Sequence, residues 1–460
     1  MASGSCGERR ARVLAVVHLA PADTKKVGTA FDLPIALALL AATGQLDPHT
    51  LHDLIIVGEL GLDGEIRGVR GMLSIARHVA RSRSDRLFVP PVNLAEAALI
   101  AHLVERLVSC STLGALVTAL RTGTLHHVVV PQRAAPNARE ELDFADVVGQ
   151  VSAKRALEVA AAGGHNVMLL GPPGAGKTML ARRLPTILPT LSEEEALDVI
   201  AVQSVAGLVT SDTPLPPPRP FRAPHHTISY AGLVGGGRSP HPGEVSLAHL
   251  GVLFLDELLE FSRRALEALR QPLEDGRVVI TRAQRTVIYP AQVTLVGAAN
   301  PCPCGHAGDP AVPCRCAMRD VRRYQARLSG PLADRIDMHV FVGAVPIDEL
   351  SGHNAPSSEG SESIRARVEA ARAMQRARYR GTLSNAHAGG RWLDSCTPVD
   401  ADARGLLVKA ATTYKFSARA YHRVLRVART IADLDVAAGI SRPAVAEALR
   451  YRTVSTEDEI

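Results

Sequence analysis

Eight consecutive residues combine glycines, a lysine and a threonine at the spacing of a phosphate-binding loop. They are Gly171, Pro172, Pro173, Gly174, Ala175, Gly176, Lys177 and Thr178, which match the pattern G-x-x-x-x-G-K-[ST]. The glycines let backbone N–H groups wrap around phosphate oxygens, Lys177 supplies a positive charge, and Thr178 offers a hydroxyl to Mg²⁺. The alternative is a chance glycine-rich turn. Because the loop follows an apolar run and precedes a helical stretch, the sequence predicts a nucleoside triphosphate site.

Three polar residues at the ends of two apolar runs could complete this site. Asp256 and Glu257 end the run VLFLDE, and Asn300 ends the run VTLVGAAN. In such positions Asp256 can lie near Mg²⁺, Glu257 near the attacking water, and Asn300 beside the γ-phosphate. The alternatives are an acidic pair that begins a surface helix and an asparagine in a turn before Pro301.

The elements that position these residues are almost wholly apolar runs. NVMLL precedes the glycine-rich loop, and the two runs named above are similar in composition. Apolar strands interleaved with helical stretches indicate a parallel sheet that is buried on both faces. We therefore expect an α/β fold in the middle of the chain.

A group of cysteines follows Asn300. Cys302, Cys304, Cys314 and Cys316 form two C-x-C pairs with nine residues between them. Four thiolates this close can complete a tetrahedral structural Zn²⁺ site, and a catalytic zinc is not expected because four sulfur ligands leave no open position. The C-x-C spacing is less specific than C-x₂-C. Reduced, metal-free thiols and a redox switch are the alternatives.

A pair of histidines, His225 and His226, could suggest another metal site. A spaced carboxylate partner is not apparent in the sequence. We therefore interpret the two side chains as bonded to phosphate or to backbone groups.

Composition and charge limit the function classes. Of 460 residues, 46% are hydrophobic and 21% charged, so the chain is neither mainly disordered nor collagen-like. Aromatic residues make up only 3%, which argues against single-strand binding by base stacking, whereas the net charge of +6 is compatible with nucleic acid. No apolar run is long enough to span a membrane, no secretory signal is apparent, and the cysteines do not suit a disulfide framework. We expect a cytoplasmic protein without a membrane partner.

The central segment closely resembles AAA+ ATPases of the magnesium-chelatase type, and in particular the YifB/ComM family. The resemblance is carried by DFADVVGQVSAKRALEVAAAGGHNVMLLGPPGAGKTMLARRLPTILP, FRAPHHTISYAGLVGGGRSPHPGEVSLAHLGVLFLDE, LVGAANPCPCG and LSGPLADRIDMHV. It implies that ATP is the nucleotide. It also implies a Walker A motif at Lys177 and Thr178, a Walker B motif at Asp256 and Glu257, and Asn300 as sensor 1.

The same resemblance assigns two arginines to the reaction. Arg335, in LADRID, resembles the arginine finger that reaches the γ-phosphate of a neighbouring subunit, which implies a ring; we expect a homohexamer. The alternative for Arg335 is an ion pair with either aspartate of LADRID. Arg419, in SARAYHRVLRVARTIADL, resembles sensor 2, and Arg423 and Arg426 compete for that role.

The resemblance also implies DNA as a partner. Gly276–Pro290 resembles the pre-sensor hairpin that faces the central channel, where Arg282 and Arg285 would meet DNA phosphates; the alternative is a solvated hairpin tip. The family implies a motor that uses ATP to drive branch migration of joint molecules in natural transformation and recombination. One alternative is a chelatase-like ATPase that remodels a protein partner. Another is a scaffold or protease relative.

The N-terminal part resembles a Lon-protease domain of the α+β class. The counterpart of the catalytic serine is Ala30, which has no hydroxyl, so no proteolysis is expected. Few residues precede the matching VHLAPAD segment, and we expect this domain to be truncated. The expected order is a Lon-protease-like domain at residues 1–127, a linker at 128–144, an AAA+ P-loop core with the cysteine loop at 145–350, a linker at 351–363, and a chelatase-type helical lid over the nucleotide at 364–460.

Overall fold

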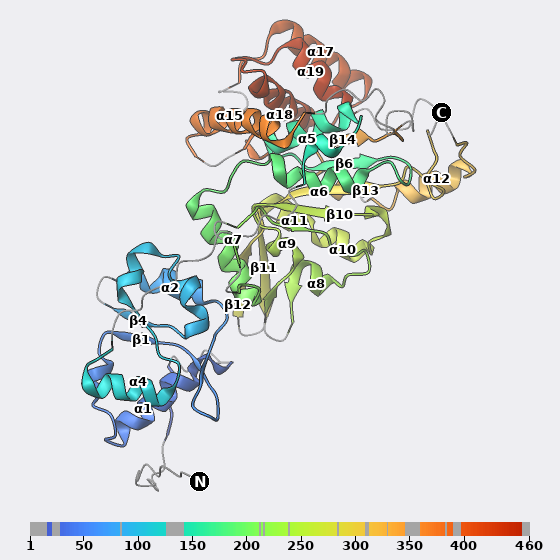
Figure 1. Cartoon of the computed structure of the whole chain (residues 1–460). Helices are drawn as coiled ribbons and strands as arrows, with labels where there is room; N and C mark the ends of the chain where they lie inside the picture. The colour runs from blue at the N-terminus through green and yellow to red at the C-terminus, as the bar shows by residue number, and fades with distance from the viewer. Residues whose placement is uncertain are drawn as a thin grey trace. The chain divides into compact units, whose positions relative to one another are not determined.

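A computed structural model of the chain shows how these elements are arranged (Figure 1). It describes residues 16–20, 28–82, 85–125, 142–210, 213–214, 217–237, 240–282, 285–308, 312–328, 330–345, 359–381, 384–389 and 397–452. The chain forms two compact units. The first comprises Met1–Pro136, Ile200–Leu215 and Ala283–Arg285, and the second comprises Asn137–Val199, Pro216–Arg282 and Thr286–Ile460.

The first unit contains a small parallel sheet. Its strands are β1 (Leu54–Ile56), β4 (Arg86–Phe88) and β5 (Leu107–Val108), in the order β1-β4-β5. Leu33 of helix α1 (Asp32–Ala42) and Leu116 of helix α4 (Leu113–Thr122) are buried in one core with Phe88. The shorter elements of this unit are β2 (Glu59–Leu60), β3 (Ile66–Arg67), α2 (Met72–Val79) and α3 (Leu94–Ala97).

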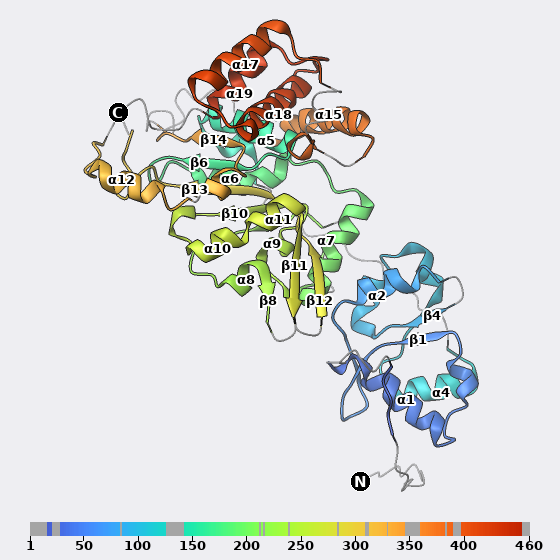
Figure 2. The same ribbon diagram turned by 180° about the vertical axis from the view of Figure 1, so that it is seen from behind.

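The second unit is built on a five-stranded parallel sheet (Figures 1 and 2). The strands are β6 (Val167–Leu170), β7 (Phe221–Arg222), β10 (Val252–Leu255), β13 (Thr294–Ala299) and β14 (Met338–Phe341), in the order β14-β6-β13-β10-β7. Every residue of β10 is buried, as are all residues of β13 after its first. Burial of consecutive residues means that both faces are covered, so the predicted parallel sheet is confirmed.

Helices pack along this sheet and join its strands. α5 (Val151–Gly163) contacts β14 and α6 (Lys177–Ile187), and α6 contacts β10 and β13. The other elements from residue 144 to residue 333 are η5 (Phe144–Asp146), α7 (Glu193–Ala206), α8 (Tyr230–Val234), β8 (Gly235–Gly236), β9 (His241–Pro242), α9 (Glu244–Leu247), η6 (Leu258–Glu260), α10 (Arg263–Ala268), α11 (Arg270–Asp275), the two-stranded β11 (Arg277–Arg282) and β12 (Arg285–Pro290), α12 (Met318–Gln325) and α13 (Gly330–Ala333).

The C-terminal region is helical, as the sequence predicts. It consists of α15 (Ser361–Tyr379), η7 (Asn385–His387), α17 (Ala401–Thr413), α18 (Ala418–Leu434) and α19 (Arg442–Arg450). α15 and α18 both pack on α5, and the apolar residues of all three helices belong to one continuous core with the sheet. Figure 2 shows these helices gathered beside β14 and α5.

The C-terminal end of each expected linker is an ordered part of this core. Helix α15 begins at Ser361, inside the segment assigned to a linker, and Phe144 at the end of the other linker is fully buried. The Phe144 N–H donates to Ser361 Oγ at 2.9 Å, and the Ser361 N–H donates to Asp143 Oδ1 at 3.0 Å. The two segments therefore cap each other, a pairing that polar composition alone does not reveal.

A buried carboxylate holds the C-terminal helices together. Asp433 is 1% exposed and accepts hydrogen bonds from Arg378, Arg429 and Asn385. An unpaired charge at this depth would cost several kcal/mol, so these donors are required for the fold. Among the described residues, no helix is long and apolar enough to cross a membrane.

Candidate nucleotide site

The phosphate-binding loop connects β6 to α6, as the sequence predicts. Gly174 and Gly176 have φ of 77° and 86°, a left-handed conformation that residues with a Cβ rarely adopt. Gly176 directly precedes the first residue of α6, so the loop places its N–H groups at a helix N-terminus, where the helix dipole favours anions. The backbone therefore has the form needed to bind phosphate.

Lys177 is buried within this loop. Its side chain is 9% exposed, and Nζ donates to the carbonyl oxygens of Gly171 at 2.7 Å and Pro172 at 2.8 Å. Nζ also donates to Asn300 Oδ1 at 3.2 Å, which joins the loop to the end of β13. Burial lowers the pKa of Lys177, and the Asp256 carboxylate opposes that shift. The ammonium group is thus held among oxygen acceptors at the place where phosphate charge would lie.

Thr178 and Asp256 meet beside Lys177. The Thr178 hydroxyl donates to Asp256 Oδ2 at 2.9 Å, so two oxygen ligands from α6 and the end of β10 are adjacent. Hard oxygen donors of this kind are what Mg²⁺ requires, and a nucleotide phosphate normally completes its coordination. These two residues therefore fit a magnesium ion bound together with a nucleotide.

Glu257 has an unusual backbone conformation and a polar neighbour. Its φ of 49° is left-handed, a strained conformation for a residue with a side chain and one that is frequent at active sites. The side chain is 59% exposed, and Oε2 lies 3.3 Å from Nδ1 of His226. Both residues line a cavity of about 270 Å³ together with Thr178, Arg182 and Asp256. A carboxylate in this cavity can accept a proton from a water molecule beside the phosphate.

The role of His226 was missed by the sequence analysis, which found no carboxylate partner for the histidine pair. The partner is Glu257, which is remote in sequence and reaches His226 only because of the sheet order. His225 instead contacts Thr227: its Nδ1 accepts from the Thr227 backbone N–H at 3.4 Å and lies 2.9 Å from the hydroxyl oxygen. The proposed backbone or phosphate pairing therefore holds in part for His225, whereas His226 belongs to the candidate site.

Arg335 lies at the amino ends of the strands, opposite the end that carries the phosphate-binding loop. It precedes β14, and its carbonyl accepts a hydrogen bond of 2.9 Å from Asn166, the residue before β6. Its guanidinium forms an ion pair with Glu274 of α11. Arg335 therefore forms an ion pair within its own chain, with Glu274 as a partner. Asp334 and Asp337 instead face Arg423, at 3.7 and 3.8 Å.

The candidate sensor 2 residues lie on this same side. Arg419 is exposed in the first turn of α18, and Arg423 lies one turn later on the same face. Arg426 donates to the Ala386 carbonyl at 3.1 Å. Among the described residues, no hydrogen bond or ion pair joins the C-terminal helices to Gly171–Thr178. The lid over the nucleotide therefore stays a prediction.

A buried aspartate fixes the C-terminal helices to this edge. Asp337 accepts from the Asn166 N–H at 3.2 Å and lies 3.5 Å from His165 Nδ1. Burial alone would raise the pKa of Asp337, but His165 and Arg423 outweigh that effect, so the pKa is lowered. His165 also contacts the Thr430 hydroxyl of α18 at 2.8 Å.

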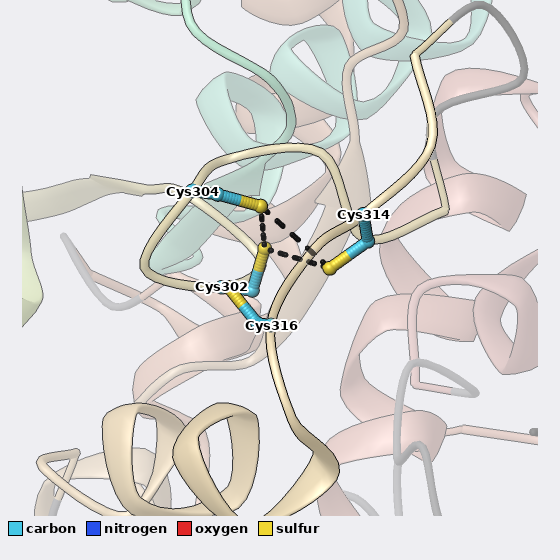
Figure 3. Close-up of side chains that lie close together, drawn as sticks. All are labelled: Cys302, Cys304, Cys314 and Cys316. Atoms are coloured by element: carbon cyan, nitrogen blue, oxygen red, sulfur yellow. Dashed lines mark hydrogen bonds between the residues drawn. The ribbon is translucent and has the colours of Figure 1, made fainter.

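The four cysteines of the loop after Asn300 converge on one point (Figure 3). Their sulfur atoms all lie within 4.8 Å of one another. The Sγ of Cys302 is 3.4 Å from Cys304 and 3.6 Å from Cys314, and the Cys304–Cys314 distance is also 3.6 Å. A tetrahedron with Zn–S bonds of about 2.3 Å has edges of about 3.8 Å. The thiols are therefore already close to the geometry of a Zn²⁺ site.

The environment of Cys304 favours a metal-binding thiolate. Backbone N–H groups of Arg315 and His306 donate to its sulfur and lower the pKa of Cys304 to about 6. A thiolate, unlike a thiol, is a zinc ligand. His306, in the same loop, does not belong to the cluster of four.

Three other residues singled out in the sequence belong to η1, β11 and β12. Ala30 is part of η1 (Thr29–Phe31), where its carbonyl accepts from the Gly58 N–H at 3.1 Å. A methyl side chain cannot act as a nucleophile. Arg282 ends β11 and Arg285 begins β12, but their side chains lie outside the described part of the chain.

Replacing Gly171 by alanine should destabilise the second unit. A Cβ at this position would lie 2.0 Å from the carbonyl oxygen of Val342, which is backbone and cannot move aside. We expect a loss of about 1–3 kcal/mol or more, measured as a lower Tm by calorimetry. The control is Gly405→Ala in α17, where a Cβ meets nothing within 4 Å, and this variant should be about 0.5–1 kcal/mol more stable. Equal Tm values for the two variants would contradict the close approach at Gly171.

Family models match most of the chain. The model described as magnesium chelatase, subunit ChlI, matches residues 143–350, and its C-terminal counterpart matches residues 358–452. A third model, described as subunit ChlI of Mg-chelatase, matches residues 5–93. These matches cover the nucleotide site, the C-terminal helices and part of the first unit.

Individual relatives agree with these models. YifB of Salmonella typhimurium is 43% identical over 447 residues, which are 95% of this chain and 85% of the relative. Competence protein ComM of Haemophilus influenzae is 42% identical over 445 residues, again 95% and 85% of the two chains. The magnesium-chelatase 67 kDa subunit of Chlorobaculum tepidum is 30% identical over 164 residues, or 34% of this chain and 23% of that subunit. The chain therefore belongs to the YifB/ComM family of magnesium-chelatase-like AAA+ ATPases.

Proposed function

We propose that this chain hydrolyses ATP at the loop Gly171–Thr178. The observation that supports this most directly is the meeting of Lys177 with Asn300 and of Thr178 with Asp256 at the carboxyl ends of three adjacent strands. In this proposal Lys177 and the loop N–H groups bind the phosphates. Glu257 accepts the proton of the attacking water, and Asn300 orients that water.

Magnesium and the histidine near Glu257 complete the proposed site. Thr178 and Asp256 would hold Mg²⁺, which supplies charge neutralisation at the phosphates when bound. His226 keeps the Glu257 carboxylate directed into the cavity through the contact at 3.3 Å. It is a positioning residue in this proposal, because it acts through Glu257.

In our proposal, a neighbouring subunit of a ring supplies an arginine to the nucleotide site. The phosphate-binding loop follows the carboxyl end of β6, whereas Arg335 is bonded to Asn166 at its amino end. A four-residue strand spans about 13 Å at 3.3 Å per residue, so the backbone of Arg335 lies about one strand length from the phosphate-binding loop of its own chain. In this proposal Arg335 reaches a nucleotide bound by the next subunit of a homohexamer, with Arg419 as a second contact.

We propose DNA as the polymer on which this ring acts. The net positive charge suits contacts with phosphates, and the low aromatic content favours tracking of the backbone over stacking with bases. The name of the relative ComM associates that protein with competence. The specific activity proposed is branch migration of joint DNA molecules, in natural transformation and recombination.

We also propose a structural zinc ion at Cys302, Cys304, Cys314 and Cys316. The support is the four sulfur atoms within 4.8 Å and the near-tetrahedral spacing of three of them. All four ligands come from protein, which leaves no position for a substrate. The ion would therefore order the loop that follows Asn300.

The test is ATP hydrolysis by the purified chain with and without a four-way DNA junction. We expect hydrolysis that the junction stimulates and that is lost in Lys177→Ala, with Arg404→Ala as a control on the exposed face of α17. Stimulation should weaken as salt is raised, because phosphate contacts release counterions. Hydrolysis that no DNA affects would contradict the DNA motor and favour a chelatase-like ATPase acting on a protein partner.

A further inference from the structure

The cysteine loop lies against the phosphate-binding loop. Cys302 is two residues after Asn300, so the metal-binding segment continues directly from the end of β13. Gly305, between the two cysteine pairs, faces Pro173: a Cβ placed on Gly305 would lie 2.6 Å from Pro173 Cδ and 2.9 Å from Cγ. The loop thus meets the nucleotide site at two places, one covalent and one by packing.

Hydrogen bonds keep the first turn of this loop compact. The Gly305 N–H donates to the Cys302 carbonyl at 3.0 Å, and the Ala307 N–H donates to Cys302 Sγ at 3.3 Å. Gln325 of α12 donates to the Pro301 carbonyl at 3.0 Å. Cys302 itself is fully buried. The chain from Asn300 to Ala307 is therefore fixed to the thiol cluster at one end and to Pro173 at its middle.

Asn300 depends on this turn for its position. Its Oδ1 accepts the hydrogen bond from Lys177, and the residue that follows is Pro301, whose carbonyl is held by α12. The sequence between the cysteine pairs is rich in glycine and proline, and cross-linking four thiolates through a metal is the usual way to order such a loop. Without the cross-link, the turn loses its main constraint.

We infer that a zinc ion in the four-cysteine site controls ATP hydrolysis, because it presses the Gly305 turn against Pro173 and fixes Asn300 beside Lys177. The inference rests on the proposed ATPase and zinc site, and it adds a regulatory link between them. The ion takes no part in the reaction. Its removal should allow Asn300 and Pro173 to shift, and a displacement of about 1 Å in a catalytic arrangement can lower the rate by about 100-fold.

The first experiment measures zinc and function in the same preparation. We expect close to one zinc per chain by elemental analysis, and a Co²⁺-substituted protein with the visible absorption of tetrahedral thiolate ligands. Chelation should lower kcat/KM for ATP by about tenfold to 100-fold, and added Zn²⁺ should restore it. Binding of a fluorescent ATP analogue is measured in parallel, because it reports on the loop even where hydrolysis is absent.

The second experiment separates the packing contact from metal binding. Gly305 and Gly308 have similar left-handed φ values of 87° and 78°, but a Cβ on Gly308 meets nothing within 4 Å. Alanine at either position therefore introduces comparable backbone strain. We expect Gly305→Ala to keep zinc and to lose about tenfold in kcat/KM, while Gly308→Ala keeps both. Cys314→Ser should lose zinc and activity together.

Three results would overturn the inference at different points. Absence of zinc and of Co²⁺ binding would show that the four cysteines do not hold a metal ion. If zinc can be removed without a change in hydrolysis or in nucleotide affinity, the four cysteines bind a metal that does not influence the ATP site. Equal kcat/KM for Gly305→Ala and Gly308→Ala would show that the contact between Gly305 and Pro173 does not affect hydrolysis. If the zinc-loaded chain binds the ATP analogue in a zinc-dependent manner without hydrolysing ATP, the link stands and the proposed ATPase activity fails.

Discussion

Glu257→Gln should abolish ATP hydrolysis while leaving ATP bound. The substitution keeps the size of the side chain and removes its ability to accept a proton from water. A positioned general base contributes about 10²–10⁴-fold to a rate, so kcat should fall by that factor. The Kd for ATP should change by less than about threefold, because the phosphates are bound by Lys177 and the loop backbone rather than by Glu257. Steady-state hydrolysis and nucleotide titration measure the two quantities.

A matched control exists three residues further along the chain. Glu260 lies at the end of η6 and its carboxylate accepts from Arg327 at 2.7 Å, outside the cavity that holds Glu257. Glu260→Gln removes an ion pair between exposed side chains, worth about 0–1 kcal/mol, and should hydrolyse ATP at the wild-type rate. If both variants lose activity equally, the loss reflects damage to η6 rather than a missing base. If Glu257→Gln remains active, the base lies elsewhere in the cavity.

Substitution of His226 provides a second test of the same site. Its Nδ1 lies 3.3 Å from Glu257 Oε2, so removing the imidazole should leave the Glu257 carboxylate less well directed into the cavity. His226→Ala should therefore lower kcat with little change in the Kd for ATP, whereas a contact that only stabilises the fold would lower the Tm and leave kcat unchanged.

The parallel sheet and the nucleotide loop were predictable from local sequence. VLFL and VTLVGAA are runs of consecutive apolar residues, and only a strand covered on both faces requires that pattern. The loop was predictable because Gly174 and Gly176 occupy left-handed positions that the spacing of the motif already encodes. These features depend on neighbours in sequence, so one chain is enough to find them.

Contacts between distant residues were not predictable in the same way. Arg335 has two aspartates beside it in LADRID, yet it pairs with Glu274 of α11, while those aspartates face Arg423 of α18. The ion-pair partner of Arg335 depends on the sheet order β14-β6-β13-β10-β7, because that order determines which helices pack beside each strand. The same is true of His226, whose carboxylate partner comes from the end of β10. Spacing suggested the cysteine site, but its contact with Pro173 required the structure.

Arg335→Ala should lower ATP hydrolysis by about 10³–10⁵-fold, as expected for loss of an arginine that stabilises transition-state charge. We propose that this arginine acts on the neighbouring subunit, and that proposal has a direct test by mixing. An Arg335→Ala chain has an intact phosphate-binding loop, and a Lys177→Ala chain has an intact arginine. In mixed rings, about a quarter of interfaces pair the intact loop of the first with the intact arginine of the second.

The mixture should therefore recover hydrolysis that neither variant shows alone, at about a quarter of the wild-type rate per site. An arginine that served its own chain would give no recovery, because no chain in the mixture carries both groups. Arg327→Ala is the control, since Arg327 also forms an ion pair with a glutamate but lies just after α12 rather than directly before β14. It should remain active alone. Full activity of Arg335→Ala would instead mean that the pair with Glu274 is only structural, and that Arg419 or Arg423 supplies the charge from the same edge.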